Sequence, residues 1–159
     1  IGIEPALKVA ADHFPGGRVG VMATEVTLRE EKFDHLMHRL DRECTITKIP
    51  APGLVQLVEQ GKVDHPETDA LLHGILDPYV GQLDALVLGC THYPFMKGAM
   101  RQVLGDATEL LDGGEGTARE TRRRLLEAGL LNEGDGDLIV ENSSGDPEKI
   151  ALTHRLLEA

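Results

Sequence analysis

Tryptophan is absent from the sequence, and aromatic residues of all kinds make up only 3% of its 159 positions. A hydrophobic core must therefore be built from aliphatic side chains. The 41% apolar content is enough for one domain, or for one domain and part of another. The apolar runs are too short to span a bilayer, and none has the pattern of a signal peptide. We therefore expect no membrane partner.

Positive charge is also scarce, since 16 lysines and arginines face 27 aspartates and glutamates and the formal net charge is -11. A surface this acidic repels nucleic acid and anionic lipid, so we expect no nucleic-acid partner. The one basic run, Arg122–Arg124, is surrounded by acidic residues. This pattern is typical of a solvated helix face and not of a phosphate-binding patch.

Cysteine occurs only at Cys44 and Cys90. Two cysteines in a chain of this length do not form a disulfide framework, which favours a reducing, cytoplasmic setting. The sequence has no Cys-x-x-Cys pair, so the usual ligand spacing of a zinc site is missing. We predict no metal site.

The sequence does contain short apolar runs that alternate with amphipathic stretches, a pattern typical of βα units. We predict an α/β fold with an open, mainly parallel sheet flanked by helices, flavodoxin-like, whose four strands precede residue 112. A helix, a strand and a helix should follow. The expected strands are Arg18–Ala23, Cys44–Ile49, Ala85–Gly89, Glu109–Leu111 and Leu138–Val140.

Several helix starts are also expected. Thr27, with a glutamate three residues later, forms a capping box ahead of an apolar i, i+3, i+4, i+7 stripe that begins at Phe33. Thr117 has the same spacing to a glutamate and predicts the start of another helix. Pro66 and Pro147 suit the first turns of two more.

The strongest candidate for chemistry follows the third strand, in the run Gly-Cys-Thr-His-Tyr-Pro that starts at Gly89. Ligands bind outside the carboxyl ends of the strands in open α/β sheets. A following helix N-terminus would favour a thiolate at Cys90, and His92 can add to this effect. Thr91 offers a hydroxyl and an N–H to an anionic ligand group. The alternative is that Cys90 is a small buried hydrophobe and His92 a capping residue, but the position at a strand end favours function.

A Cys/His loop is compatible with three chemistries. The thiolate can attack a carbonyl to form a thioester, or it can remove a proton from carbon. Metal ligation is the third, although one cysteine and one nearby histidine do not make a site. Cys44 lies at the start of its strand, at the opposite edge of a parallel sheet from Cys90, and we interpret it as structural.

Three further polar residues are candidates on weaker grounds. Thr24 and Thr27 follow the first strand, at the same sheet edge as Cys90, although a helix N-cap is sufficient to explain Thr27. Glu59 ends a short helical stretch and is an ordinary surface acid unless it reaches His92.

The run Leu-Val-Leu-Gly-Cys-Thr-His-Tyr-Pro, from Leu86 to Pro94, closely resembles the second-cysteine motif of bacterial glutamate racemases, within the aspartate/glutamate racemase superfamily. The resemblance extends along nearly the whole chain. The chain departs from the family pattern at Glu25–Val26, where glycine is usual, and at Gly113–Gly114. Further similar segments are Glu4–Ala6, Val21–Thr24, Pro52–Glu59, Leu110–Asp112 and Ser144–Pro147.

This resemblance implies racemisation of glutamate without a cofactor, to supply D-glutamate for peptidoglycan. Two thiols would face opposite sides of the substrate's α-carbon, and Cys90 would be one of these two bases. His92 would support its proton transfer, and Glu59 would orient His92. The implied substrate-binding residues are Thr91, Thr24 and Thr27.

In the family, the other thiol and a substrate-binding Asp-Ser loop belong to a first domain that precedes these residues. The resemblance therefore implies that residues 1–112 are the second racemase domain and that residues 113–159 complete the first. The start at Ile1, without an initiator methionine, also indicates part of a longer protein. We expect the isolated chain to have little or no racemase activity.

Other readings stay open. A strand at Leu138–Val140 would have no partner and would invite pairing with another chain, so we expect the C-terminal segment to be mobile or exchanged within a homodimer. The function could instead be that of a Cys/His hydrolase or transferase that works through a thioester, or of an amino-acid-binding remnant without catalysis. Aspartate could also replace glutamate as the substrate.

Overall fold

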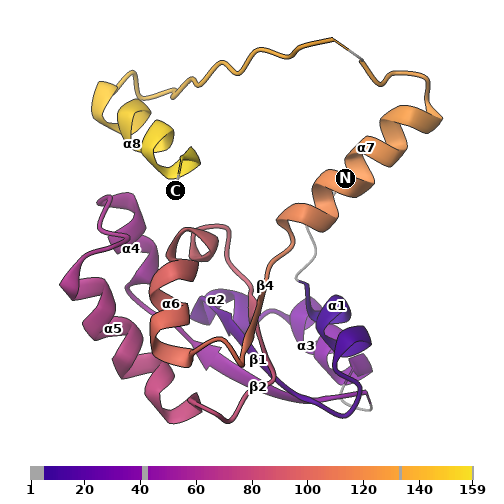
Figure 1. The fold of residues 1–159 in the computed structure, drawn as a ribbon, viewed down its shortest axis with the longest axis vertical. Helices are drawn as coiled ribbons and strands as arrows, with labels where there is room; N and C mark the ends of the chain where they lie inside the picture. Colours follow the sequence, from indigo (N-terminus) through magenta and orange to yellow (C-terminus); the bar gives the residue numbers. More distant parts are fainter. Residues whose placement is uncertain (1–5, 41–42, 133, 159) are drawn as a thin grey trace.

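The computed structural model describes residues 6–40, 43–132 and 134–158, so Glu4 and Pro5 of the family resemblance lie outside the described residues. A four-stranded parallel sheet in the order β2-β1-β3-β4 forms its centre (Figure 1). The predictions for these four strands are confirmed to within one residue at each end. The strands are β1 (Arg18–Ala23), β2 (Thr45–Pro50), β3 (Ala85–Leu88) and β4 (Glu109–Leu111).

Helices cover both faces of the sheet (Figure 1). Successive strand residues point to opposite faces, so Val21 joins the core beneath one set of helices and Met22 the core beneath the other. Both are fully buried, which explains why β1 and β3 are apolar along almost their whole length. One face carries α1 (Leu7–His13) and α3 (Glu31–Leu40), and the other carries α4 (Leu54–Glu59), α5 (Pro66–Leu76) and α6 (Lys97–Leu104).

The strands β1, β2 and β3 end level with one another. Met22 of β1 is opposite Ile49 of β2 on one side and opposite Leu88 of β3 on the other. The residues that follow these strands therefore lie at one edge of the sheet, where open α/β proteins bind ligands.

The predicted N-cap at Thr27 is wrong. Thr24 caps the short helix α2 (Glu25–Leu28), because its backbone is extended and its hydroxyl accepts the N–H of Thr27 at 3.3 Å. Thr27 is thus inside this helix, and α3 begins only at Glu31. The apolar stripe of α3 is confirmed, since Phe33 and Met37 are buried.

Of the other predicted helix starts, two are confirmed and one is wrong. Pro66 and Pro147 lie in the first turns of α5 and α8 (Pro147–Leu157), as predicted. The capping box at Thr117 is wrong, because α7 (Gly114–Glu127) begins three residues earlier. There the Asp112 carboxylate accepts the N–H of Gly114 at 2.6 Å and satisfies one of the unpaired N–H groups of the first turn.

The C-terminal segment, residues 113–158, stands apart from the sheet. Helix α7 projects away from β4, and a long connection leads to α8, which returns toward α4 (Figure 1). The predicted strand at Leu138–Val140 is wrong: these residues have no regular structure, because no neighbouring strand among the described residues offers them a ladder. Within the described residues, every helix is too short or too polar to cross a membrane.

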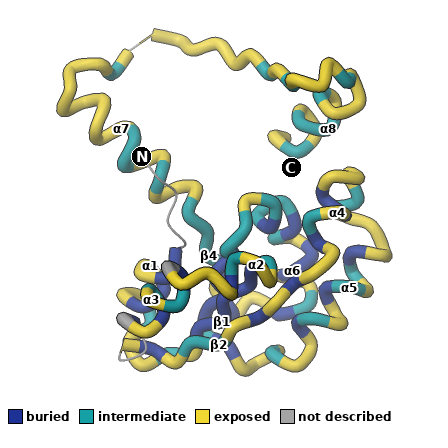
Figure 2. The backbone as a smooth tube through the Cα atoms, turned by 180° about the vertical axis from the view of Figure 1, so that it is seen from behind, coloured by how far each residue is buried: buried dark blue, intermediate teal, exposed yellow. Residues whose placement is uncertain are grey.

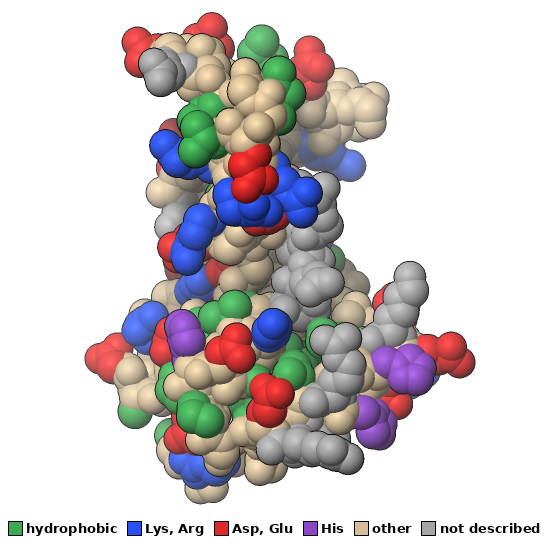
Figure 3. Space-filling model, turned by 90° about the vertical axis from the view of Figure 1, so that its right-hand side faces the viewer, with side chains coloured by type: hydrophobic (Ala, Val, Ile, Leu, Met, Phe, Trp, Pro, Cys, Tyr) green, Lys and Arg blue, Asp and Glu red, His purple; other side chains and the backbone are tan. Residues whose placement is uncertain are grey.

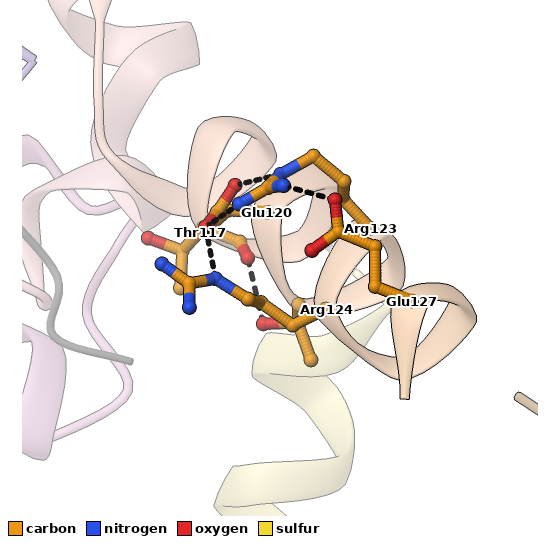
Figure 4. A network of polar contacts seen from close by, with 6 residues as sticks. Thr117, Glu120, Arg123, Arg124 and Glu127 are labelled. Carbon is orange, nitrogen blue, oxygen red and sulfur yellow. Dashed lines mark hydrogen bonds and ion pairs between the residues drawn. The ribbon is translucent and has the colours of Figure 1, made fainter. Parts of the chain in front are cut away.

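The basic run on α7 is a solvated helix face, as predicted. Glu120 accepts hydrogen bonds from Arg123 and Arg124 at 2.7 Å, and Arg123 also donates to Glu127 (Figure 4). Side chains of both charges lie beside exposed apolar ones in the part of the molecule that α7 forms (Figure 3). Arg123 and Arg124 are therefore paired with acidic residues of their own helix.

Candidate active site

The Cys90 loop leaves β3 through a glycine that lies tightly against β1. The N–H of Gly89 donates to the carbonyl of Met22 at 2.8 Å. A Cβ at this position would lie 3.0 Å from the Cβ of Ala23, closer than side chains normally pack. Glycine therefore allows the backbone to pass close to the end of β1 directly before Cys90.

A buried tyrosine holds the other side of this loop. Tyr93 begins the short 3-10 helix η2 (Tyr93–Met96), and its side chain is fully buried. Its hydroxyl donates to the carbonyl of Ala51, directly after β2, at 3.0 Å. Burial and, to a lesser degree, the charge of Cys90 raise the pKa of the phenol above its usual value of 10.0. The sequence interpretation assigned Tyr93 no role, although a tyrosine inside a strand-end motif is a signal that could have been used.

Cys90, His92 and Glu59 form a continuous polar chain. The Sγ of Cys90 is 3.8 Å from Nδ1 of His92, and Nε2 of His92 is 2.8 Å from Oε1 of Glu59. Cys90 is half-buried, whereas the Glu59 side chain is 61% exposed and the His92 side chain 29%. When Nε2 carries the proton that Glu59 accepts, Nδ1 presents a lone pair to the sulfur. An imidazole in this position can take a proton from the thiol and return it.

Glu59 reaches His92 because α4 is short and firmly packed. The helix starts after Gly53, whose φ of 87° turns the chain after β2. Leu54 and Val58 bury its inner face in the core. Glu59 is the last residue of the helix, so its side chain extends beyond the core to the sheet edge.

The three threonines lie at or near the same edge but in different surroundings. Thr24 follows β1 directly, and its hydroxyl is 3.0 Å from that of Thr27, so these two half-buried hydroxyls form one polar cluster. Thr91 is exposed on the loop after Cys90. The structure thus brings Cys90, His92 and Glu59 into contact, and it pairs Thr24 with Thr27.

Cys44 is separate from this cluster, as the sequence interpretation expected. It is only 4% exposed and immediately precedes β2, at the amino end of the sheet. Its Sγ lies 3.9 Å from the carbonyl of Leu40. Among the described residues, no three His, Cys, Asp or Glu side chains converge in a way that could hold a metal ion.

The fold and the site describe a flavodoxin-like α/β domain with a thiol, an imidazole and a carboxylate at the carboxyl edge of its sheet. Residues 1–121 match the Asp/Glu/hydantoin racemase family, and the chain belongs to this family. The Asp/Glu racemase resemblance of the Cys90 motif is thereby confirmed.

Curated relatives are similar to this protein over almost the whole chain. A glutamate racemase of Clostridium perfringens (strain SM101) is 40% identical over 99% of the chain and 62% of the relative. One from Bifidobacterium animalis subsp. lactis is 46% identical over 99% of the chain and 64% of the relative. The chain thus spans a little over three fifths of the length of these relatives.

Solved glutamate racemases share the fold. The Thermus thermophilus enzyme, in complex with beta-chloro-D-alanine, matches with a TM-score of 0.74 at 36% identity, over 97% of this chain and 57% of that one. The Escherichia coli enzyme, in complex with L-glutamate and the activator UDP-MurNAc-ala, also has a TM-score of 0.74, at 29% identity, over 98% of this chain and 61% of that one.

Proposed function

We propose that this chain is the second domain and C-terminal segment of a glutamate racemase, with Cys90 as one of two bases that exchange the α-proton of glutamate. The observation that carries the proposal is the chain of contacts from Cys90 through His92 to Glu59 at the carboxyl edge of the sheet. Family membership and the names of the similar proteins support the reaction class.

The proton transfer follows from these contacts. In one direction, the Cys90 thiolate removes the α-proton and becomes a thiol, while a thiol on the other side of the substrate gives its proton to the same carbon. In the other direction, the roles are reversed. His92 accepts or returns the thiol proton through Nδ1, and Glu59 holds the ring by accepting from Nε2. No cofactor takes part in this proposal.

The second base must come from outside the described residues, because Cys44 lies at the far edge of the sheet. We assign it to the first domain, which residues 113–159 would complete while residues 1–112 form the second. The hydroxyls of Thr24, Thr27 and Thr91 would bind the carboxylates of the substrate. The product, D-glutamate, would serve peptidoglycan synthesis in the cytoplasm.

The test is the incorporation of solvent deuterium into glutamate, together with a coupled assay for D-glutamate. The isolated chain should show little or no turnover. A chimera can be built by adding, ahead of Ile1, the part of the Bifidobacterium animalis relative that this chain does not match. This chimera should racemise glutamate. In this chimera, Cys90→Ala should lower the racemisation rate by roughly 10²–10⁴-fold, because a proton-transfer group is lost.

Cys44→Ala is the matched control, since it removes the other thiol from a position away from the site. It should leave the rate unchanged. A folded chimera that binds glutamate without exchange would indicate a binding protein instead. A mass increase at Cys90 with an acyl substrate would indicate thioester chemistry. Turnover by the isolated chain near that of the chimera would contradict the need for a second domain.

A further inference from the structure

The C-terminal helix α8 is seated on the end of α4, the helix that carries Glu59. Leu156 packs against the same core cluster as Val58. Leu152 approaches Gly61, just after α4: a Cβ on this glycine would lie 3.1 Å from Cδ1 of Leu152. Gly61 has a φ of 69°, so it both turns the chain and leaves room for α8. Figure 1 shows α8 beside α4 at the end of the long connection from α7.

A hollow of about 270 Å³ lies between α8 and the body. Glu59, His92 and Phe95 line it on one side. On the other side, Leu152 and Leu156 of α8 line it together with the polar residues Lys149 and Thr153. α8 is therefore a wall of the space around the imidazole–carboxylate contact. In the described part of the chain, Cys90 does not line this hollow. α8 therefore borders the imidazole–carboxylate contact and not the thiol.

This arrangement matters because the Glu59 side chain is more than half exposed. An exposed carboxylate has several rotamers, and water competes for its hydrogen bond to the imidazole. The two leucines of this wall exclude water from part of the hollow, which strengthens the contact electrostatically.

We propose that α8 positions the His92–Glu59 pair. In this proposal Leu152 and Leu156 are positioning residues, which act on the pair by holding α8 in place. This inference rests on the proposed function for its consequence in catalysis, although its structural part can be measured without turnover. When α8 is seated, His92 is shielded on one side and Glu59 remains in contact with Nε2. When α8 is released, water enters the hollow and the pair separates more often.

The structural test is the rate at which diethyl pyrocarbonate modifies each histidine at fixed pH, followed by mass spectrometry. Leu152→Ala and Leu156→Ala should each speed modification of His92 by about fivefold, because local opening becomes more frequent. The other histidines of the chain serve as internal references and should not change. His154→Ala, on the exposed side of α8, is the matched control and should leave the His92 rate unchanged.

Leu152→Met and Leu156→Met retain apolar bulk and should restore slow modification of His92. An unchanged His92 rate in both alanine variants would overturn the proposal. A uniform increase at all histidines would also overturn it, because α8 would then support the whole body and not this pair.

The catalytic test uses the chimera described above. Leu152→Ala should lower kcat about fivefold with little change in KM, because the pair acts in proton transfer and not in substrate binding. His154→Ala should change neither. If the chimera without these substitutions does not racemise glutamate, the proposed function fails while the histidine measurement still decides the role of α8. A fall confined to KM would contradict the positioning role.

Discussion

The body of the molecule, residues 6–112, and its C-terminal segment are held together in different ways. Every buried residue among those described belongs to the body, and none belongs to residues 113–158 (Figure 2). The segment nevertheless has two helices and several exposed leucines, among them Leu126 at 59% and Leu130 at 70% exposure. Its helices are thus specified by local sequence, whereas the body is specified by a shared core. The exposed apolar side chains of α7 fit the proposal that residues 113–159 complete another domain.

Amide exchange is the measurement that separates the two regions most strongly. The amides of β1 and β3 should exchange at least about a thousandfold more slowly than those of α7, because core strands open only with global unfolding. α8 should be intermediate, since it touches the body. Hydrogen exchange followed by NMR checks this at low protein concentration. Protection of α7 equal to that of β3 in a monomer would remove the distinction. Protection of residues 138–140 that grows with concentration would indicate pairing between chains.

Truncation of one leucine in each region compares their cores directly. Leu86→Ala removes a fully buried side chain from β3 and should lower the free energy of unfolding by about 2–5 kcal/mol. Leu126→Ala, the matched change on α7, should alter it by less than about 0.5 kcal/mol. Denaturant unfolding followed by circular dichroism gives both values. A loss at Leu126 comparable to that at Leu86 would mean that α7 packs on a surface of its own.

Two glycine substitutions in the body compare a tightly packed position at the site with an open position on a helix. Gly89→Ala should destabilise the fold by about 1–3 kcal/mol, because the added methyl group would press on Ala23 and on the carbonyl of Met22. Gly74→Ala is the control, since nothing lies within 4 Å of its Cβ position inside α5. It should stabilise by about 0.5–1 kcal/mol through helix propensity. Thermal unfolding of both variants checks the signs. Destabilisation by both would point to a general intolerance of change.

The smallest expected effect is in α7 and depends on pH. Hydrogen bonds from Arg123 and then Arg124 lower the pKa of Glu120 from 4.5 to about 2. A pKa lower in the folded state means that the contribution to stability is present above pH 4.5 and is lost as the pH falls toward 2. NMR titration of the Glu120 carboxyl carbon checks this, and Glu120→Gln should abolish the acid-dependent loss of helicity in α7. A titration midpoint at the ordinary value would contradict the ion-pair network of Figure 4.

Much of the fold could be predicted because the strands of the body are unbroken apolar runs bounded by turns. The same criterion failed at Leu138–Val140, because a strand also needs a neighbour and the local sequence does not contain that information. Capping boxes failed for a related reason. At Thr27 the pattern was present, but this residue lies inside α2, which Thr24 caps, and α3 begins only at Glu31. At Thr117 the pattern was also present, but α7 had already begun at Gly114, whose N–H is accepted by Asp112.

The contacts of the candidate site also divide into those that the sequence predicts and those that it does not. Cys90 and His92 are two residues apart, so their contact follows from the motif itself. Glu59 is 33 residues from His92, and only the family resemblance suggested that the two meet. The seating of α8 could not be predicted, because it depends on a close approach to Gly61 across more than ninety residues of chain. The sequence therefore predicts the contact between residues that are close in the chain. It does not predict the contacts between distant residues that support the site.

The hydrogen bond from Tyr93 to Ala51 has a consequence for how the Cys90 loop responds to its own chemistry. Because the pKa of the phenol is raised above its usual value, it remains protonated across the range in which a thiol ionises. The loop anchor therefore does not change when the sulfur gains or loses a proton. In the proposed reaction, the sulfur would therefore exchange its proton without a change in the hydrogen bond that anchors its loop.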